Sequence, residues 1–218
     1  MLGGIEINQS VMPDSIKIGP LSGSNSPFLV VPSSALSANE DGLIGGNLLA
    51  RADIEFDFAH AKFNMFLPDH CPNQVVYWTR DTYAQVPIHV DAYWHISAPI
   101  TLDGKSLTAI IDTGSDQSAM SLAMVKSLFG IDVKDPAMKN TGMSSTNGLA
   151  DTPIYRYPFK ELVLEGLSIK SPGIDILPDE LYGKDEKTML IGQDILRQLR
   201  IYIAYKEGML YATPAEAK

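Results

Sequence analysis

The sequence is poor in cysteine, in clustered basic residues and in long apolar runs. Its 218 residues include one cysteine, Cys71, which excludes an internal disulfide bond. The formal net charge is −9, and Lys and Arg form no cluster that reverses it locally, which argues against nucleic acid as a partner. The longest apolar runs are interrupted by Gly, Pro or charge, so no membrane span is expected. The remaining composition, 45% hydrophobic, is that of an ordinary globular protein.

The cellular location is left open. The first residues, MLGGIEINQS, lack the basic and apolar regions of a signal peptide. The single cysteine identifies no compartment, because periplasmic proteins can also lack disulfides.

Most of the chain has the pattern of short β-strands. Residues alternate between apolar and polar in Asp53–Phe58 and in Arg200–Tyr205, and Phe159–Ile169 is rich in Val, Leu and Ile. Turns are expected at Asp103-Gly104, Asn147-Gly148 and Glu207-Gly208. The pattern predicts a mostly β protein.

Helical patterns are few and short. One helix is expected over Ser121–Phe129, with Ser118 or Ser121 as its N-cap. A second is expected over Gln193–Leu199. Between the strand-rich regions, Leu67–Val86 is broken by prolines and polar residues, and is interpreted as a linker with a short strand around Gln74–Trp78.

An internal repeat is suggested by two similar heptapeptides. LIGGNLL, Leu43–Leu49, aligns with LIGQDIL, Leu190–Leu196, at an offset of 147, and four of the seven residues are identical. The same offset places the strand pattern of Asp53–Phe58 on that of Arg200–Tyr205. We therefore expect two copies of one unit, of which the first lacks a counterpart of the segment AIIDTGSDQSAMS.

That segment, Ala109–Ser121, carries the main chemical signal. Asp112 follows two apolar β-branched residues, and an acid at the end of a buried strand is costly unless it has a role. By itself it is open to a simpler interpretation, in which the aspartate begins a turn that Thr113 and Gly114 complete.

Together, the two motifs resemble an aspartic protease of the retropepsin and pepsin class. The run from Ile110 to Ser115, followed by the apolar-apolar-Gly turn and short helix of Leu190–Leu199, is similar to the paired motifs of that family, in a two-lobe form of bacterial type. The resemblance implies a complete lobe over residues 87–218, a closed β-barrel with few short helices. It also implies a partial first lobe over residues 1–68, truncated before its catalytic loop, and a linker over residues 69–86.

The resemblance also implies a mechanism. Two carboxylates about 3 Å apart share one proton, so that one activates water and the other acts as the acid. Asp112 would be one of them. The implied supporting residues are Thr113, with hydrogen bonds across to the other lobe, Gly114, and Ser115, with a hydrogen bond to the Asp112 carboxylate. A buttressing turn behind the loop would consist of Leu190, Ile191 and Gly192, with Leu43, Ile44 and Gly45 as its first-lobe counterpart. No metal or organic cofactor is required.

A protease of this kind also needs a flap over an extended peptide substrate that is bound through its main chain. The candidate flap lies in Thr141–Asp151, with its tip at Ser145, Thr146, Asn147 and Gly148. A plain hairpin loop is an equal alternative. Other candidates are weaker: His89, His95 and the Asp69-His70-Cys71 trio lack metal-ligand spacing and are expected to be surface or packing residues.

The second catalytic carboxylate is missing from the first copy. Four aspartates there, Asp14, Asp41, Asp53 and Asp57, lack a following Thr-Gly or Ser-Gly. Three alternatives follow: a truncated two-lobe endopeptidase, a dimer in which two copies of Asp112 meet, or a catalytically inactive peptide-binding or assembly module. An incomplete lobe leaves strand edges open, so self-association is expected.

Overall fold

The computed structural model describes residues 7–19, 21–33, 36, 41–143, 152–179 and 188–215. The chain forms two compact units, one of residues 1–43 and 144–151, the other of residues 44–143 and 152–218. In the smaller unit, β1 (Ser10–Val11) pairs antiparallel with β4 (Phe28–Leu29), and β2 (Ile16–Ile18) with β3 (Leu21–Gly23).

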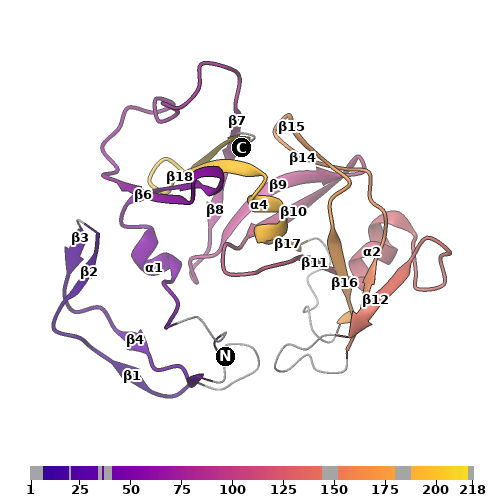
Figure 1. Ribbon diagram of the computed structural model, residues 1–218, viewed down its shortest axis with the longest axis horizontal. Coiled ribbons are helices and arrows are strands. Elements are labelled where there is room, and N and C mark those ends of the chain that lie inside the picture. The colour runs from indigo at the N-terminus through magenta and orange to yellow at the C-terminus, as the bar shows by residue number, and fades with distance from the viewer. Residues whose placement is uncertain are drawn as a thin grey trace. The chain divides into compact units, whose positions relative to one another are not determined.

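The larger unit contains a ten-stranded sheet, which Figure 1 shows in magenta and orange. Its strand order is β12-β13-β16-β11-β17-β10-β9-β14-β15, with β8 paired to β9. The strands are β8 His89–Val90, β9 Ile96–Leu102, β10 Lys105–Ile111, β11 Ser118–Ser121, β12 Lys139–Met143, β13 Pro153–Arg156, β14 Glu161–Leu164, β15 Leu167–Lys170, β16 Ile174–Leu177 and β17 Thr188–Ile191.

This sheet is open, so the expected closed barrel is wrong, although the mostly β class is confirmed. Among the described residues the ladder ends at β12 on one side and at β15 on the other. All five residues of β12 are exposed, and the pairing with β13 shifts register between Asn140 and Gly142. A closed barrel requires its first and last strands to pair with each other, and among the described residues β12 and β15 do not.

Local turn chemistry explains two of the hairpins. Asp103 and Gly104 have φ of 45° and 77° and connect β9 to β10, as their sequence predicts. Glu165 and Gly166, with φ of 42° and 82°, join β14 to β15 in the same way. Two consecutive positive φ values are those of a tight hairpin turn, whose twist matches that of the strands.

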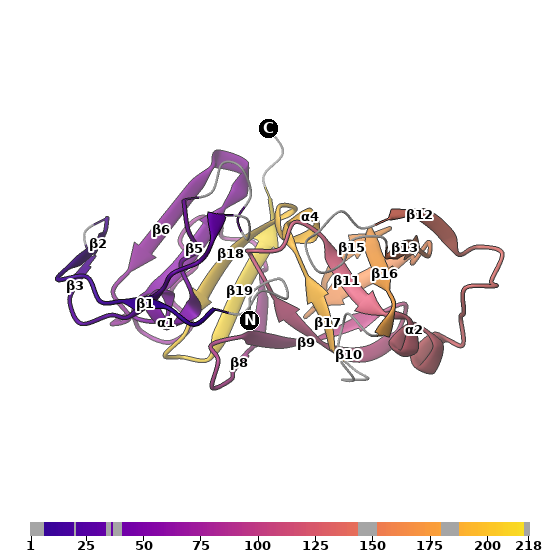
Figure 2. The same cartoon turned by 90° about the horizontal axis from the view of Figure 1, so that it is seen from below.

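A second sheet of five strands has the order β6-β5-β18-β19-β7. In Figure 2, β5 lies beside the yellow strand β18, whose other neighbour is β19. The bounds are β5 Asp53–Asp57, β6 Lys62–Phe66, β7 Ala84–Pro87, β18 Leu199–Ala204 and β19 Met209–Pro214. Glu55 lies opposite Tyr202, its equivalent at the offset of 147. The repeat stays a prediction, and this register is the one expected for two equivalent hairpins related by a two-fold axis. The predicted lobe boundaries also stay a prediction; in the structure β5 and β6 belong to the larger unit because they share this sheet.

Both predicted helices are present, and one is shorter than expected. Helix α2 (Leu122–Phe129) begins after Ser121, whose hydroxyl accepts a hydrogen bond from the Met124 amide at 3.0 Å, and ends at Gly130 with φ of 72°. Helix α4 (Gln193–Leu196) ends early because the chain enters β18 at Leu199. Two further helical elements lie within the described residues, α1 (Gly46–Leu49) and the 3₁₀ turn η2 (Phe58–His60).

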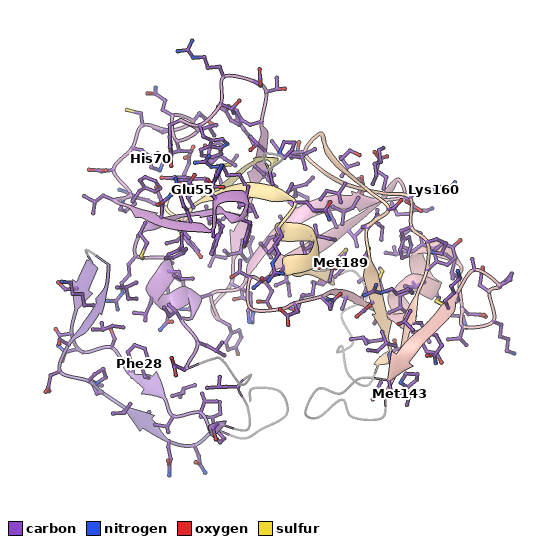
Figure 3. The ribbon with its side chains drawn as sticks, viewed as in Figure 1. Phe28, Glu55, His70, Met143, Lys160 and Met189 are labelled. Carbon is purple, nitrogen blue, oxygen red and sulfur yellow. The ribbon has the colours of Figure 1, made fainter. Side chains whose placement is uncertain are left out.

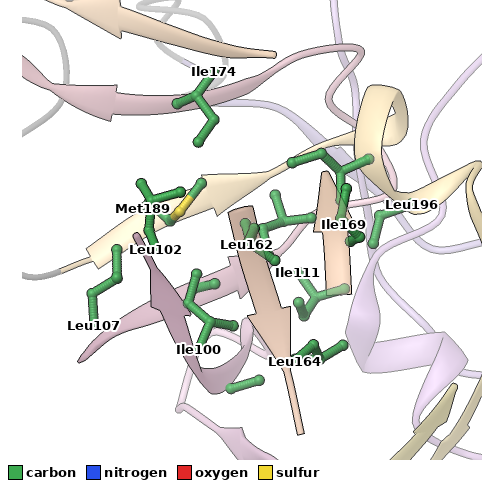
Figure 4. Packing of buried hydrophobic residues seen from close by; sticks show 14 of the residues in the cluster. Ile100, Leu102, Leu107, Ile111, Leu162, Leu164, Ile169, Ile174, Met189 and Leu196 are labelled. Carbon is green, nitrogen blue, oxygen red and sulfur yellow. The ribbon is translucent and has the colours of Figure 1, made fainter. Parts of the chain in front are cut away.

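One large apolar core joins the two sheets of the larger unit. Figure 4 shows side chains from β9, β10, β14, β15, β17 and α4 packed together, among them Leu102, Leu162, Met189 and Leu196, each at most 1% exposed. Burial alternates along β9 and β10, as expected for strands with one face on a core. The core therefore holds the strand that leads to Asp112.

Residues 67–83, here named the covering segment, lie over the other face of the five-stranded sheet. No strand forms at Gln74–Trp78, contrary to expectation. Instead Val75 is 5% exposed and packs with Tyr202 and Tyr211, and the Trp78 indole donates to the Thr213 hydroxyl at 3.0 Å. The segment is therefore part of a core and not a free spacer.

Candidate active site

Asp112 lies directly after β10, where the strand leaves the core. Its amide donates to the carbonyl of Ile191 at 3.0 Å, which continues the parallel pairing of β10 with β17. Its side chain is half-buried, and Oδ1 accepts a hydrogen bond from the Gly114 amide at 2.8 Å. The Ser115 amide donates to the Asp112 carbonyl at 3.3 Å. The carboxylate is therefore held by its own turn and still reaches solvent.

Strand β17 lies between the two ends of the Asp112 loop. It pairs in parallel with β10 and touches β11 through Ala119 and Leu190. Gly192 directly follows β17 and is tightly packed. A Cβ on it would lie 2.6 Å from the Gln117 carbonyl carbon and oxygen and 2.8 Å from the Ser115 carbonyl oxygen. Only a residue without a side chain fits here, because all three atoms belong to the backbone.

The start of α4 holds the loop through backbone hydrogen bonds. The Gln193 amide donates to the Ser115 carbonyl at 2.8 Å, and the Asp194 amide donates to the Asp116 carbonyl at 3.1 Å. The Gln193 side-chain amide donates to the Thr113 carbonyl at 2.7 Å. These contacts place the predicted buttressing turn directly behind the predicted catalytic loop.

Ser118 and Asp194 form a buried polar link that the sequence motifs do not reveal. The Ser118 hydroxyl donates to Asp194 Oδ1 at 2.6 Å and accepts from the Gly192 amide at 2.9 Å. Asp194 Oδ1 also accepts from the Ser118 amide at 2.9 Å. The only sequence signal is the Asp in the first turn of α4, which is an ordinary N-terminal preference.

The resemblance implies hydrogen-bonding roles for two loop residues, Ser115 and Thr113. The Ser115 hydroxyl donates to the Gln117 carbonyl at 2.9 Å, and not to the Asp112 carboxylate as the resemblance implies. For Thr113 the structure gives its carbonyl a partner in Gln193, and hydrogen bonds across to another lobe stay a prediction.

The candidate flap tip, Ser145, Thr146, Asn147 and Gly148, lies outside the described residues. The strands on either side of this tip, β12 and β13, are described and pair with each other. They join the main sheet through the pairing of β13 with β16. Met143, labelled in Figure 3, is the last described residue on the β12 side.

Two aspartates considered as second catalytic groups have other partners. Asp53 is fully buried on β5, where its Oδ2 lies 2.7 Å from His70 Nε2 and accepts from the Tyr202 hydroxyl at 3.1 Å. Burial raises the pKa of the Asp53 carboxyl. Asp57 lies 2.9 Å from His60 and 3.4 Å from Arg200. Figure 3 labels His70, in the covering segment, and Glu55, on β5 between the two aspartates.

The turn at residues 43–45, which is predicted to be the first-lobe counterpart of residues 190–192, is the more exposed of the two. Leu43 and Ile44 are 49% and 51% exposed, whereas Ile191 is 2% exposed. A Cβ on Gly46 would lie 2.7 Å from the backbone oxygen of Trp94, in the turn that joins β8 to β9. The first residue of α1 therefore packs against that aromatic turn.

Neither a metal-ligating group nor a long apolar helix is found in the described part of the chain. Among those residues, no group of three or more His, Cys, Asp or Glu side chains is arranged to hold a metal ion. None of the helices described there has both the length and the apolar character of a membrane span.

Several solved structures are similar to this chain. A retropepsin-like aspartic protease from Rickettsia conorii matches at 16% identity and a TM-score of 0.45, covering 64% of this chain and 99% of its own. EIAV protease, complexed with the inhibitor HBY-793, matches at 16% identity and a TM-score of 0.38, covering 50% of this chain and 91% of its own. Basic 7S globulin from soybean matches at 12% identity and 0.48, covering 90% of this chain and 64% of its own.

Comparison of the sequence with known protein sequences and with protein families gave two results. No curated protein sequence matches the chain significantly. A family model described as aspartyl protease matches residues 98–195, which run from β9 through the Asp112 loop to the first turn of α4. The matched segment thus includes the Asp112 loop, the turn at Gly192 and the contacts between them, and over these residues the chain is similar to aspartyl proteases.

Proposed function

We propose that this protein hydrolyses peptide bonds by the aspartic mechanism, with Asp112 as one of the two carboxylates. The observation that carries the proposal is the placement of Asp112. It stands half-buried at the end of a core strand, in a loop fastened to β17 and α4 by backbone hydrogen bonds from Asp112, Gln193 and Asp194. A group that must abstract a proton from water in a fixed geometry needs such support.

The second carboxylate is proposed to be Asp112 of another copy. No other aspartate in the chain is followed by Thr-Gly or Ser-Gly. When two such carboxylates approach, their repulsion raises the pKa of one of them, so the pair retains a single proton. The ionised member then removes a proton from the attacking water, and the protonated member donates to the carbonyl oxygen of the scissile bond.

The substrate is proposed to be an extended peptide, with the β12–β13 hairpin as the flap. β12 is exposed along its whole length, which leaves it accessible to an extended chain.

The test is cleavage of a peptide pool between pH 3 and 7 by the wild type, Asp112→Asn and the control Asp132→Asn, which lies in the turn after α2. Cleavage by the wild type and the control, and its loss in Asp112→Asn, is expected. Specific activity should rise with protein concentration as copies pair, and light scattering should show a dimer. A folded monomer without cleavage would contradict the proposal and would favour the alternative, a catalytically inactive peptide-binding or assembly module.

A further inference from the structure

Arg156 lies where the β12–β13 hairpin joins the main sheet. It is the last residue of β13, and it pairs with Lys139 of β12 on one side and with Asp175 of β16 on the other. Arg156 is thus at the base of the hairpin whose far end is the candidate flap. Arg156 is one of two β13 residues that pair with β16, the other being Tyr155 opposite Ile176.

The Arg156 side chain reaches past its neighbouring strand. Its Nε donates to Asp175 Oδ1 at 2.6 Å, and its Nη2 donates to Gln117 Oε1 at 3.1 Å. The register explains the reach. Asp175 lies opposite Ala119 of β11, and Gln117 is two residues before Ala119, on the same side of the chain. One rigid guanidinium therefore connects β13, β16 and the loop before β11.

Gln117 belongs to the part of the loop that packs against the buttressing turn. Its carbonyl oxygen accepts the Ser115 hydroxyl at 2.9 Å. Its backbone is also the surface against which Gly192 packs, at 2.6 Å from the position of a Cβ. A shift of Gln117 would therefore be transmitted to Ser115, three residues from Asp112, through a direct hydrogen bond.

We propose that Arg156 is a positioning residue, which couples the β12–β13 hairpin to the Asp112 loop through Gln117. This inference rests on the proposed function. Arg156 acts by holding Gln117 and Asp175 at the same time. Asp175 is only 9% exposed, and its ion pair with Arg156 fixes the guanidinium beside Gln117.

The experiment compares Arg156→Gln, Arg156→Lys and Gln117→Ala with the matched control Lys170→Gln. Lys170 also forms a cross-strand ion pair on a hairpin, with Glu161 on β14, and that pair is not connected to the Asp112 loop by the contacts described. Two experiments are made on each variant. The first measures kcat and KM on a cleaved peptide, and the second measures amide hydrogen exchange of the segment 112–118.

For Arg156→Gln we expect kcat to fall about 10- to 100-fold, the loss that a small misplacement of catalytic groups produces. Amide exchange in 112–118 should become faster. Arg156→Lys should restore neither property fully, because an ammonium group lacks the fork that reaches two strands. Combining Arg156→Gln with Gln117→Ala should add little to either single effect. Lys170→Gln should behave as the wild type.

The proposal is overturned if Arg156→Gln changes kcat and exchange no more than Lys170→Gln, or if its effects and those of Gln117→Ala are additive. If the wild type cleaves no peptide, the proposed function fails, and hydrogen exchange alone decides the coupling. Faster exchange in 112–118 for Arg156→Gln, and not for Lys170→Gln, would support it in that case.

Discussion

Replacement of Gly192 by alanine is the sharpest test of the buttressing turn. The backbone of Gly192 has φ of −99°, which any residue can adopt, so the substitution introduces no backbone strain. What it introduces is a methyl group 2.6 Å from two backbone atoms of Gln117 and 2.8 Å from the Ser115 oxygen. None of these atoms can turn aside, as the end of a flexible side chain would.

The expected loss in the free energy of unfolding follows from which atoms must move. Overpacking a tight site costs about 1–3 kcal/mol. Relief here requires the loop to separate from the turn, which would weaken the hydrogen bond from the Gly192 amide to Ser118 and that from the Gln193 amide to Ser115. Each is worth about 1 kcal/mol. We therefore expect Gly192→Ala to lower the free energy of unfolding by about 3–5 kcal/mol and to abolish cleavage.

Gly45 offers a matched control, because it occupies the equivalent position in the predicted repeat. A Cβ there would approach only the side chain of Asn47, at 2.9 Å from Oδ1. That side chain can change rotamer, so Gly45→Ala should change the free energy of unfolding by less than about 1 kcal/mol. Urea denaturation, followed by the fluorescence of Trp78 and Trp94, gives both values. If the two variants differ by less than about 1 kcal/mol, the close packing inferred at Gly192 is refuted.

Three further substitutions test the buried polar groups, each by urea denaturation. Arg200→Leu should cost about 3–5 kcal/mol, because it leaves the fully buried Glu55 carboxylate without the guanidinium 2.6 Å away; a loss below about 1 kcal/mol would contradict this. Ser118→Ala should cost about 1–3 kcal/mol by removing a donor to Asp194, and an unchanged midpoint would exclude that role. Burial raises the pKa of Asp53, so its contribution to stability is fully present below its unfolded pKa of about 3.9 and is lost as the pH rises toward the folded pKa. Asp53→Asn should therefore flatten the decline of stability with rising pH, and an unaltered slope would refute the assignment.

Features that depend on neighbouring residues were predictable from the sequence. Asp103-Gly104 forms the expected hairpin turn because both residues adopt positive φ. Ser121 caps α2, as a serine before an amphipathic run predicts. The strand expected at Gln74–Trp78 does not form, because the conformation there depends on packing against the distant strands β18 and β19.

By itself the sequence determined the mostly β class, the Asp112 motif and the second motif around Gly192, and these were enough to show the resemblance to aspartic proteases. Only the tertiary structure decided which groups support Asp112. Ser118 and Asp194 are 76 residues apart, and Gln117 and Arg156 are 39 apart. Their contacts depend on the strand order, which places β17 between β10 and β11 and β16 beside β13. A hydrogen bond of this kind has no local pattern, because it is created only when the sheet brings distant strands together.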